Sequence, residues 1–239
     1  VDQFQEAFGF RGGKFGKWVQ QGKNAKERQG MLNAAYDALM DLADIIGVPP
    51  RAISMNGELG IAFGARGSGS ASAHYEPGNV IINLTKTRGA GSLAHEWFHA
   101  LDNYFQRQRD GATGPGREQN FITYAPETYY QHKQNGQRLP AIDFEAMADG
   151  GKGRRGQIFI PSRFKRDEWT KIEGVRPQVG EAFADLVNAL NESPMRKRAW
   201  LIDKGKENGY WSRIIERGAR AFESYVIDKM QKQGYHNDY

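Results

Sequence analysis

The chain has 239 residues, a net charge of +5, a sequence pI of about 9.3 and no cysteine. This length allows one large domain with a substantial core, and the lack of cysteine excludes disulfides and thiolate metal ligands. Hydrophobic residues make up 39% and charged residues 26%, as in ordinary globular proteins, and no apolar run is long enough to span a membrane.

The same composition bears on location and partners. The lack of cysteines, and of a signal-peptide pattern at the N-terminus, favours a cytoplasmic location. The first residue is Val1 rather than Met, so we expect the chain to be part of a longer polypeptide. The positive charge favours association with nucleic acid, although a solvated basic surface is the simpler interpretation. We expect no association with a membrane.

The first part of the chain is predicted to combine a helix with short strands. The glycine- and aromatic-rich residues 8–18 indicate a short strand or a loop packed on the core. Apolar side chains recur three and four residues apart over residues 25–46, which predicts an amphipathic helix ending before Gly47. Residues 53–63 indicate one or two further strands.

A β-hairpin is predicted next. Residues 71–75 and 80–84 have strand character, and Pro77 and Gly78 fit the central positions of a type II turn. The segment expected to be helical after the hairpin carries the pattern H-E-x-x-H at His95, Glu96 and His99. A strand, a loop and a helix with this pattern follow one another in this order in zinc peptidases, in which an extended substrate pairs with a strand beside the cleft. The residues expected to bind substrate are therefore Val80, Ile81, Ile82 and Asn83.

A short motif with the spacing of a metal site follows the hairpin. His95, Glu96 and His99 form the pattern H-E-x-x-H within residues 92–102, a run without proline or glycine that we expect to be helical. Residues four apart share one helix face, so the two imidazoles can bind one zinc ion. Glu96 then lies where it can take a proton from a water acidified by the metal. The alternative interpretation is two histidines on a partly buried helix face.

The second half is predicted to contain a long irregular segment followed by helices. Residues 106–156 are poor in aliphatic side chains and rich in Gly, Gln and Arg, so we expect a surface excursion, with local order near 121–124. Helical patterns cover residues 179–190, 195–204 and 212–231. No repeat or linker interrupts the 239 residues, so a single domain is the simpler organisation.

A zinc ion held by two histidines needs a further protein ligand, which without cysteine must be His, Asp or Glu. Glu181 and Glu216, both on predicted helices, are suitable, and spacing does not choose between them. Glu223 is an alternative ligand or a residue that orients one; it lies two turns after Glu216, roughly 10 Å along the axis, so one zinc ion cannot bind both. Asp102, three residues after His99, can orient a ligand or form a salt bridge at the helix end.

The chain resembles a known family over nearly its whole length. The motifs that carry the resemblance are residues 9–16 (GFRGGKFG), 62–67 (AFGARG), 74–78 (HYEPG), 84–102 (LTKTRGAGSLAHEWFHALD) and 219–225 (ARAFESY). They resemble the first of the large polyvalent protein-associated domains, which occur within long multidomain proteins of phages and conjugative elements. The resemblance implies an α+β, zincin-like metallopeptidase fold, with a small mixed sheet, a helix carrying H-E-x-x-H and further packed helices. It also implies action in a bacterial host cell or delivery with mobile-element DNA.

A weaker resemblance is to gluzincins similar to anthrax lethal factor. In these enzymes H-E-x-x-H is followed downstream by a Tyr and then by the pattern E-x-x-A-x-A-F, whose Glu binds zinc. Here the pattern falls on Tyr210 and on Glu216 with the residues up to Phe222. The resemblance implies that Glu216 is the third ligand and that Tyr210 donates a hydrogen bond to the oxyanion. The alternative for Glu216 is a solvated ion pair with Arg220.

Together these features predict a zinc-dependent endopeptidase that acts on a protein or peptide substrate. His95, His99 and Glu216 are the expected metal ligands, Glu96 is the expected general base, and Tyr210 is the expected oxyanion donor. The alternative is a non-catalytic module on the same fold that binds nucleic acid or a protein partner through its basic surface. A binding module has no chemical need for both histidines and Glu96, so we prefer the peptidase.

Overall fold

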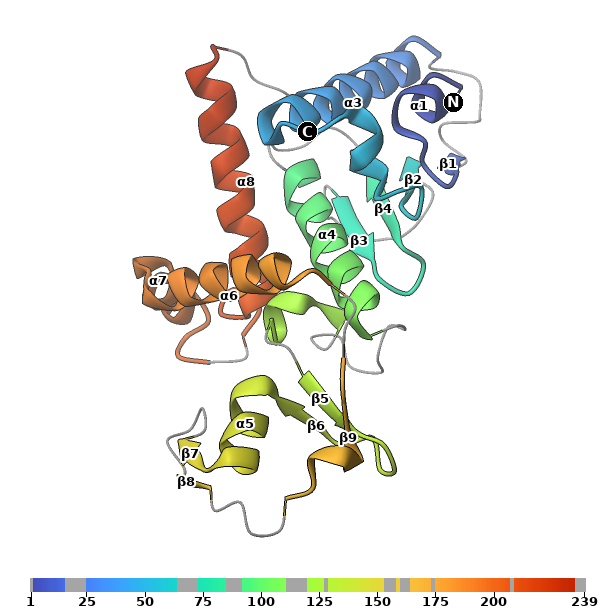
Figure 1. Cartoon of the computed structure of the whole chain (residues 1–239). Coiled ribbons are helices and arrows are strands. Elements are labelled where there is room, and N and C mark those ends of the chain that lie inside the picture. The colour runs from blue at the N-terminus through green and yellow to red at the C-terminus, as the bar shows by residue number, and fades with distance from the viewer. Residues whose placement is uncertain are drawn as a thin grey trace. The chain divides into compact units, whose positions relative to one another are not determined.

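The computed structural model of the chain is a mixed α+β protein (Figure 1), which confirms the predicted fold class at this level. It divides into two compact units, unit 1 with residues Val1–Tyr104 and Ser193–Tyr239, and unit 2 with residues Phe105–Glu192. No described helix is long and apolar enough to cross a membrane. The residues that the structure describes are 2–15, 25–63, 73–84, 92–110, 120–126, 129–152, 158–159, 164–172, 175–206 and 209–234.

Unit 1 contains a four-stranded sheet in the order β1-β2-β4-β3. β1 (Gly13–Phe15) is parallel to β2 (Gly60–Phe63), and β2 is parallel to β4 (Ile81–Leu84). β3 (Ala73–Glu76) runs antiparallel to β4, with Tyr75 opposite Ile82. β3 and β4 are the predicted hairpin. β3 is therefore the outer strand on this side of the sheet.

This topology corrects the expected substrate strand. β4 pairs with β2 on one side and with β3 on the other, so Ile81, Ile82 and Asn83 have no unpaired strand edge to offer a substrate. Val80 lies outside β4 and has a positive φ of 51°. The sequence pattern of a buried strand does not distinguish an inner from an outer position, because that depends on pairing with residues far away in the chain.

The turn of this hairpin also differs from the prediction. A type II turn requires a positive φ at its third residue, which would be Gly78. Gly78 does not have one, whereas Val80 does. The amide of Asn79 donates to the carbonyl of Glu76 at 3.1 Å, so the chain still reverses at Pro77 and Gly78.

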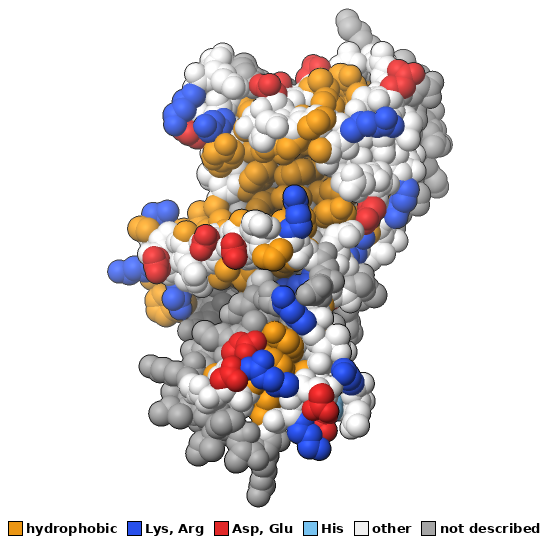
Figure 2. Space-filling model, in the orientation of Figure 1, with side chains coloured by type: hydrophobic (Ala, Val, Ile, Leu, Met, Phe, Trp, Pro, Cys, Tyr) orange, Lys and Arg blue, Asp and Glu red, His pale blue; other side chains and the backbone are white. Residues whose placement is uncertain are grey.

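Helices pack with the sheet around one core in unit 1. α1 (Asp2–Phe8), α3 (Ala25–Ile46), α4 (Ser92–Asp110) and α8 (Ile214–Lys232) all contribute to it. The predicted helices are confirmed, including α7 (Pro194–Ile202), whereas α1 was not predicted. The largest fully buried hydrophobic side chains are Phe8, Leu39, Ile53, Leu59, Ile82 and Leu84. On the face shown in Figure 2, hydrophobic side chains gather over unit 1.

Aromatic side chains join α4 to α8. The ring of Phe222 on α8 stacks on Trp97 with centroids 5.7 Å apart, and lies 5.4 Å from Phe98. The indole of Trp97 also donates a buried hydrogen bond to the carbonyl of Ile53 at 3.0 Å. Phe98 stands immediately before His99, so its bulk serves to pack α4 against α8. These contacts fix the two helices that carry the candidate metal ligands.

Unit 2 includes the predicted surface excursion, residues 106–156, and continues to Glu192. It contains a sheet in the order β6-β5-β9, formed by Arg138–Pro140, Tyr129–His132 and Trp169–Lys171, and a short pairing of β7 (Gly151–Lys152) with β8 (Ile158–Phe159). Its helices are α5 (Ala141–Asp149) and α6 (Pro177–Glu192), and a 3-10 turn, Ile122–Tyr124, confirms the expected local order.

Aromatic rings rather than aliphatic side chains hold part of unit 2 together. Tyr130 of β5 stacks on Phe144 of α5 at 3.5 Å, and Phe164 stacks on Trp169 at 5.7 Å. A segment with few aliphatic residues therefore forms ordered elements that a search for aliphatic periodicity does not find. That the two units form one domain stays a prediction.

Candidate metal centre

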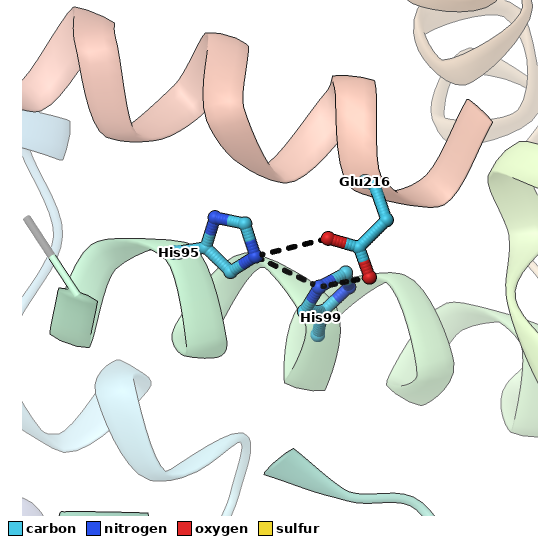
Figure 3. Close-up of side chains that lie close together, drawn as sticks. All are labelled: His95, His99 and Glu216. Carbon is cyan, nitrogen blue, oxygen red and sulfur yellow. Dashed lines mark hydrogen bonds and ion pairs between the residues drawn. The ribbon is translucent and has the colours of Figure 1, made fainter. Parts of the chain in front are cut away.

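Three side chains that can bind a metal converge in unit 1. His95 and His99 project from α4, and Glu216 projects toward them from the first turn of α8 (Figure 3). All three are buried, and one ligand atom from each lies within 4.8 Å of the others. Helical spacing brings the two histidines together, and the α4–α8 packing supplies the glutamate. The third ligand that the resemblance implied is therefore beside the histidines.

The spacing of these atoms fits a tetrahedral metal site. The two histidine Nε2 atoms are 3.2 Å apart, His95 Nε2 is 3.5 Å from Glu216 Oε2, and His99 Nε2 is 3.8 Å from Glu216 Oε1. Ligand distances of roughly 2.0–2.2 Å give a tetrahedron with edges of about 3.3–3.6 Å. Glu216 Oε2 is also buried without a hydrogen-bond partner among the described residues. A cation between the three side chains would satisfy this oxygen.

The surroundings of the two histidines shift their pKa values in opposite directions. Burial alone would lower the pKa of His95, but its contacts with Glu216 and Glu223 and the charge of Glu96 raise it to about 9. Burial and the positive charge of His95 lower the pKa of His99 to about 4. Burial opposes ionisation of Glu216, yet its histidine neighbours lower the pKa of that carboxyl. In the absence of a metal, His95 is therefore a positively charged imidazolium near neutral pH, whereas His99 is neutral.

Metal binding should consequently release about one proton per ion at pH 6, where a zinc-bound water with a pKa of roughly 7 still keeps its protons. A metal ligand must be a neutral imidazole, and the pKa of His95, about 9, lies above this pH, whereas that of His99, about 4, lies below it. Calorimetric titration with Zn²⁺ in buffers of different ionisation enthalpy measures the number. The proton that His95 contributes should be lost as the pH rises through about 9. Release of two protons, or of none, at pH 6 would contradict this assignment.

Glu96 lies beside the cluster and is held by the outer strand of the sheet. Its Oε2 accepts a hydrogen bond of 2.7 Å from the backbone amide of Tyr75 in β3. The Tyr75 hydroxyl in turn donates to Asn103 Oδ1 on α4, also at 2.7 Å. Burial raises the pKa of Glu96, the change that a general base needs to accept a proton near neutral pH. Only one of its oxygens is used by Tyr75, so the other can accept a proton.

Glu223 contacts the opposite side of His95. Its Oε2 lies 3.2 Å from His95 Nδ1, whereas Glu216 approaches Nε2. Two turns of α8 thus place one carboxylate at each ring nitrogen. When a carboxylate accepts the Nδ1 proton, Nε2 keeps its lone pair for a metal and the ring is fixed in orientation. This geometry fits a role for Glu223 in orienting His95 as a ligand.

Glu223→Gln should therefore weaken Zn²⁺ binding by roughly 10–100-fold without changing its stoichiometry. The amide cannot accept the Nδ1 proton as strongly as a carboxylate does, so His95 becomes a weaker ligand. Competition with a chromophoric chelator measures the affinity. Asp228→Asn, which neutralises an exposed carboxylate on the same helix, is the matched control. A loss of stoichiometry in Glu223→Gln would instead make Glu223 a direct ligand.

A group of arginine and aromatic side chains borders Glu216. Arg213 and Arg220 place Nη2 atoms 3.8 and 3.6 Å from its two oxygens. The guanidinium of Arg220 lies 3.8 Å from the ring centre of Trp211, and Tyr210 is near both arginines. Burial, followed by the negative charge of Glu216, raises the pKa of the Tyr210 hydroxyl. Glu216 is only 6% exposed, so the alternative interpretation of the Glu216–Arg220 spacing as a solvated ion pair is wrong.

The two remaining candidates, Asp102 and Glu181, do not belong to the group of His95, His99 and Glu216 found among the described residues. Asp102 is fully buried in the middle of α4 rather than at a helix end, and its orienting role stays a prediction. Glu181 is exposed on α6 in unit 2 and is not in the metal-binding group found among the described residues. Local spacing could not have separated Glu181 from Glu216, because the choice depends on which helix packs against α4.

Comparison with known proteins supports the family that the motifs indicated. No curated protein and no solved structure matched the chain. A match was found to the family model described as large polyvalent protein-associated domain 1, over residues 202–239. This stretch includes Tyr210, Glu216, Glu223 and the whole of α8. The expected resemblance to large polyvalent protein-associated domain 1 is thereby confirmed over residues 202–239.

Proposed function

We propose that the chain is a zinc-dependent endopeptidase of the gluzincin type, with a zincin-like fold in unit 1. The observation that carries the proposal is the buried cluster of His95, His99 and Glu216 with the carboxylate of Glu96 beside it. A structural metal site would have no use for a carboxylate that binds no metal and has a raised pKa. A hydrolytic site needs such a group as its base.

The donor set suits zinc. Two imidazoles and one carboxylate are the ligands of catalytic zinc sites that keep an open position for substrate. A bound zinc ion supplies Lewis acidity, which lowers the pKa of water to roughly 7 and polarises a carbonyl group. His95, His99 and Glu216 would hold the ion, and Glu223 would keep the His95 ring in place through Nδ1.

The residues of the chain have distinct tasks in peptide hydrolysis. The oxygen of Glu96 that does not bind Tyr75 takes the proton of the attacking water and later passes it to the leaving amine. Tyr210 is about half exposed, and its hydroxyl, which interacts with Glu216, donates a hydrogen bond to the oxyanion. β3 is the outer strand and passes beside Glu96, so we infer that an extended substrate pairs with β3 rather than with β4.

The family match gives this activity a setting. A domain of a polyvalent protein from a phage or conjugative element would process its own long parent chain, or cut host proteins after DNA transfer. Both roles place the substrate in the bacterial cytoplasm, and both need an endopeptidase that accepts extended segments.

The test is digestion of a mixed peptide library and of an unfolded protein by the zinc-loaded chain, followed by mass spectrometry of the new termini. Cleavage should stop when a chelator removes the metal and return when Zn²⁺ is added back. Absence of new termini from every substrate, or cleavage that survives the chelator, would exclude the proposed activity. Salt-sensitive DNA binding without metal would then favour the non-catalytic module.

A further inference from the structure

Arg213 and Arg220 flank the proposed zinc ligand on α8. Arg213 occupies the N-cap position of the helix, three residues before Glu216, and Arg220 follows Glu216 by four residues. Their distances to Glu216, 3.8 and 3.6 Å, are those of ion pairs rather than of hydrogen bonds. Both side chains are 24% exposed, so the two guanidinium groups also reach toward solvent. Positive charge thus accumulates directly beside the metal-binding cluster.

Aromatic rings hold these guanidinium groups in place. Arg220 lies over Trp211 at 3.8 Å and near Tyr210 at 5.4 Å, and Arg213 lies near the same Tyr210 ring at 5.2 Å. Stacking fixes the plane of a guanidinium and leaves the donors along its edge available. The Nε atoms of both arginines are buried, so the donors that a ligand can reach belong to the partly exposed outer parts of the two side chains. The arrangement is that of a preformed site for a planar anion.

With a metal bound, the charges around the histidine pair favour the binding of one more anion. The charged neighbours of the histidine pair are the carboxylates of Glu96, Glu216 and Glu223 and the two arginines. With both histidines neutral, as metal binding requires, these groups sum to one negative charge, and a divalent metal turns this into one positive charge. A bound metal would compensate the negative charge of Glu216, so the positive charges of the two arginines would be available to another anion.

We propose that Arg213 and Arg220 bind a carboxylate group of the peptide substrate and make the site selective for acidic peptides. This assignment rests on the proposed peptidase function and names the substrate class of the same site. The carboxylate can come from an Asp or Glu side chain or from a free C-terminus. A nucleic-acid backbone fits less well, because the two guanidinium groups lie around a single residue, Glu216, and match one carboxylate rather than a row of successive phosphates.

The test compares binding of matched fluorescent peptides to the zinc-loaded Glu96→Gln protein, in which turnover is blocked. One peptide carries Asp and Glu, a second carries Asn and Gln at the same positions, and each is made with a free and an amidated C-terminus. We expect the peptide with carboxylates to bind at least about tenfold more tightly, the effect of one charge-assisted hydrogen bond. Amidation or side-chain neutralisation, whichever removes the preference, identifies the source of the carboxylate.

Variants then assign the preference to the two arginines. Arg213→Gln and Arg220→Gln should each reduce the preference for the acidic peptide to less than about threefold, while zinc content and binding of the neutral peptide stay unchanged. Arg198→Gln, which removes an exposed charge of the same sign from α7 in unit 1, should leave the preference intact.

Three results would overturn the carboxylate site. These are equal binding of the acidic and neutral peptides, parallel loss of zinc and of both peptides in the arginine variants, and displacement of the acidic peptide by DNA at lower concentration than by itself. The peptidase proposal is judged separately by the wild-type protein. Cleavage of acidic and neutral peptides at equal rates would leave the peptidase standing and remove only the selectivity.

Discussion

Glu96→Gln is expected to retain wild-type zinc content and to hydrolyse peptides roughly 100–10,000-fold more slowly than the wild type. Glu96 contributes no atom to the cluster of His95, His99 and Glu216, so its replacement removes no ligand. The glutamine oxygen can still accept the hydrogen bond from the Tyr75 amide, which preserves the local structure. The amide cannot, however, take a proton from water. The loss should therefore appear in kcat, with zinc content measured on the same samples.

The pH dependence of the wild type supplies an independent signature of Glu96. Burial raises its pKa, so the protonated, inactive form persists to higher pH than for an exposed glutamate. Activity should therefore fall as the pH drops through this raised value and be retained above it. Glu6→Gln, an exposed glutamate of α1, is the matched control and should behave as the wild type. Turnover by Glu96→Gln at the wild-type rate would remove Glu96 from the mechanism.

Glu216→Gln is expected to weaken zinc binding by more than about 100-fold, beyond the effect of losing a partner that only orients a ligand. An amide oxygen carries no charge, and the carboxylate is the one anionic ligand of the cluster. The variant also leaves Arg213 and Arg220 close to a neutral side chain, which further disfavours a cation at this place. Zinc content after gel filtration and chelator competition measure the change.

Two controls make the Glu216 result specific. Glu181→Gln alters the other glutamate that the sequence offered as a ligand and should keep full zinc content. Asp228→Asn neutralises an exposed carboxylate on α8 and should do the same. Wild-type zinc affinity in Glu216→Gln, combined with loss in Glu223→Gln or Glu181→Gln, would transfer the ligand role to that residue. Circular dichroism of each variant separates loss of the site from loss of the fold.

The fold could be predicted where a local period specifies an element. The bounds of α3 follow from its apolar spacing and from Gly47 and the prolines after it, and α8 differs from its prediction by two residues at its start and one at its end. Strand order could not be predicted, because pairing of β2 with β4 joins segments that local pattern does not relate. The strands of unit 2 and α5 were not predicted, because stacked aromatic rings there replace an aliphatic pattern.

The candidate site was predictable in its local part only. His95, Glu96 and His99 follow from the spacing of one helix, whereas Glu216 required a resemblance because it lies on a distant helix. The different tasks of Glu216 and Glu223 depend on which nitrogen of His95 each one approaches. The hydrogen bond from the Tyr75 amide to Glu96 is donated by the backbone, so the identity of the residue at position 75 does not predict it. The spacing of Arg213 and Arg220 around Glu216 can be read from the sequence, but only the structure shows that Glu216 is buried between them.

The proposed metal centre is best tested by a crystal structure of the zinc-loaded protein with anomalous diffraction at the zinc edge. We expect one strong peak per chain, roughly 2.0–2.2 Å from His95 Nε2, His99 Nε2 and an oxygen of Glu216. Glu96 should lie outside ligand distance and Glu223 should remain at His95 Nδ1. A peak bound by other residues, or no peak between the two histidines in crystals grown with Zn²⁺, would contradict the metal centre and the peptidase that depends on it.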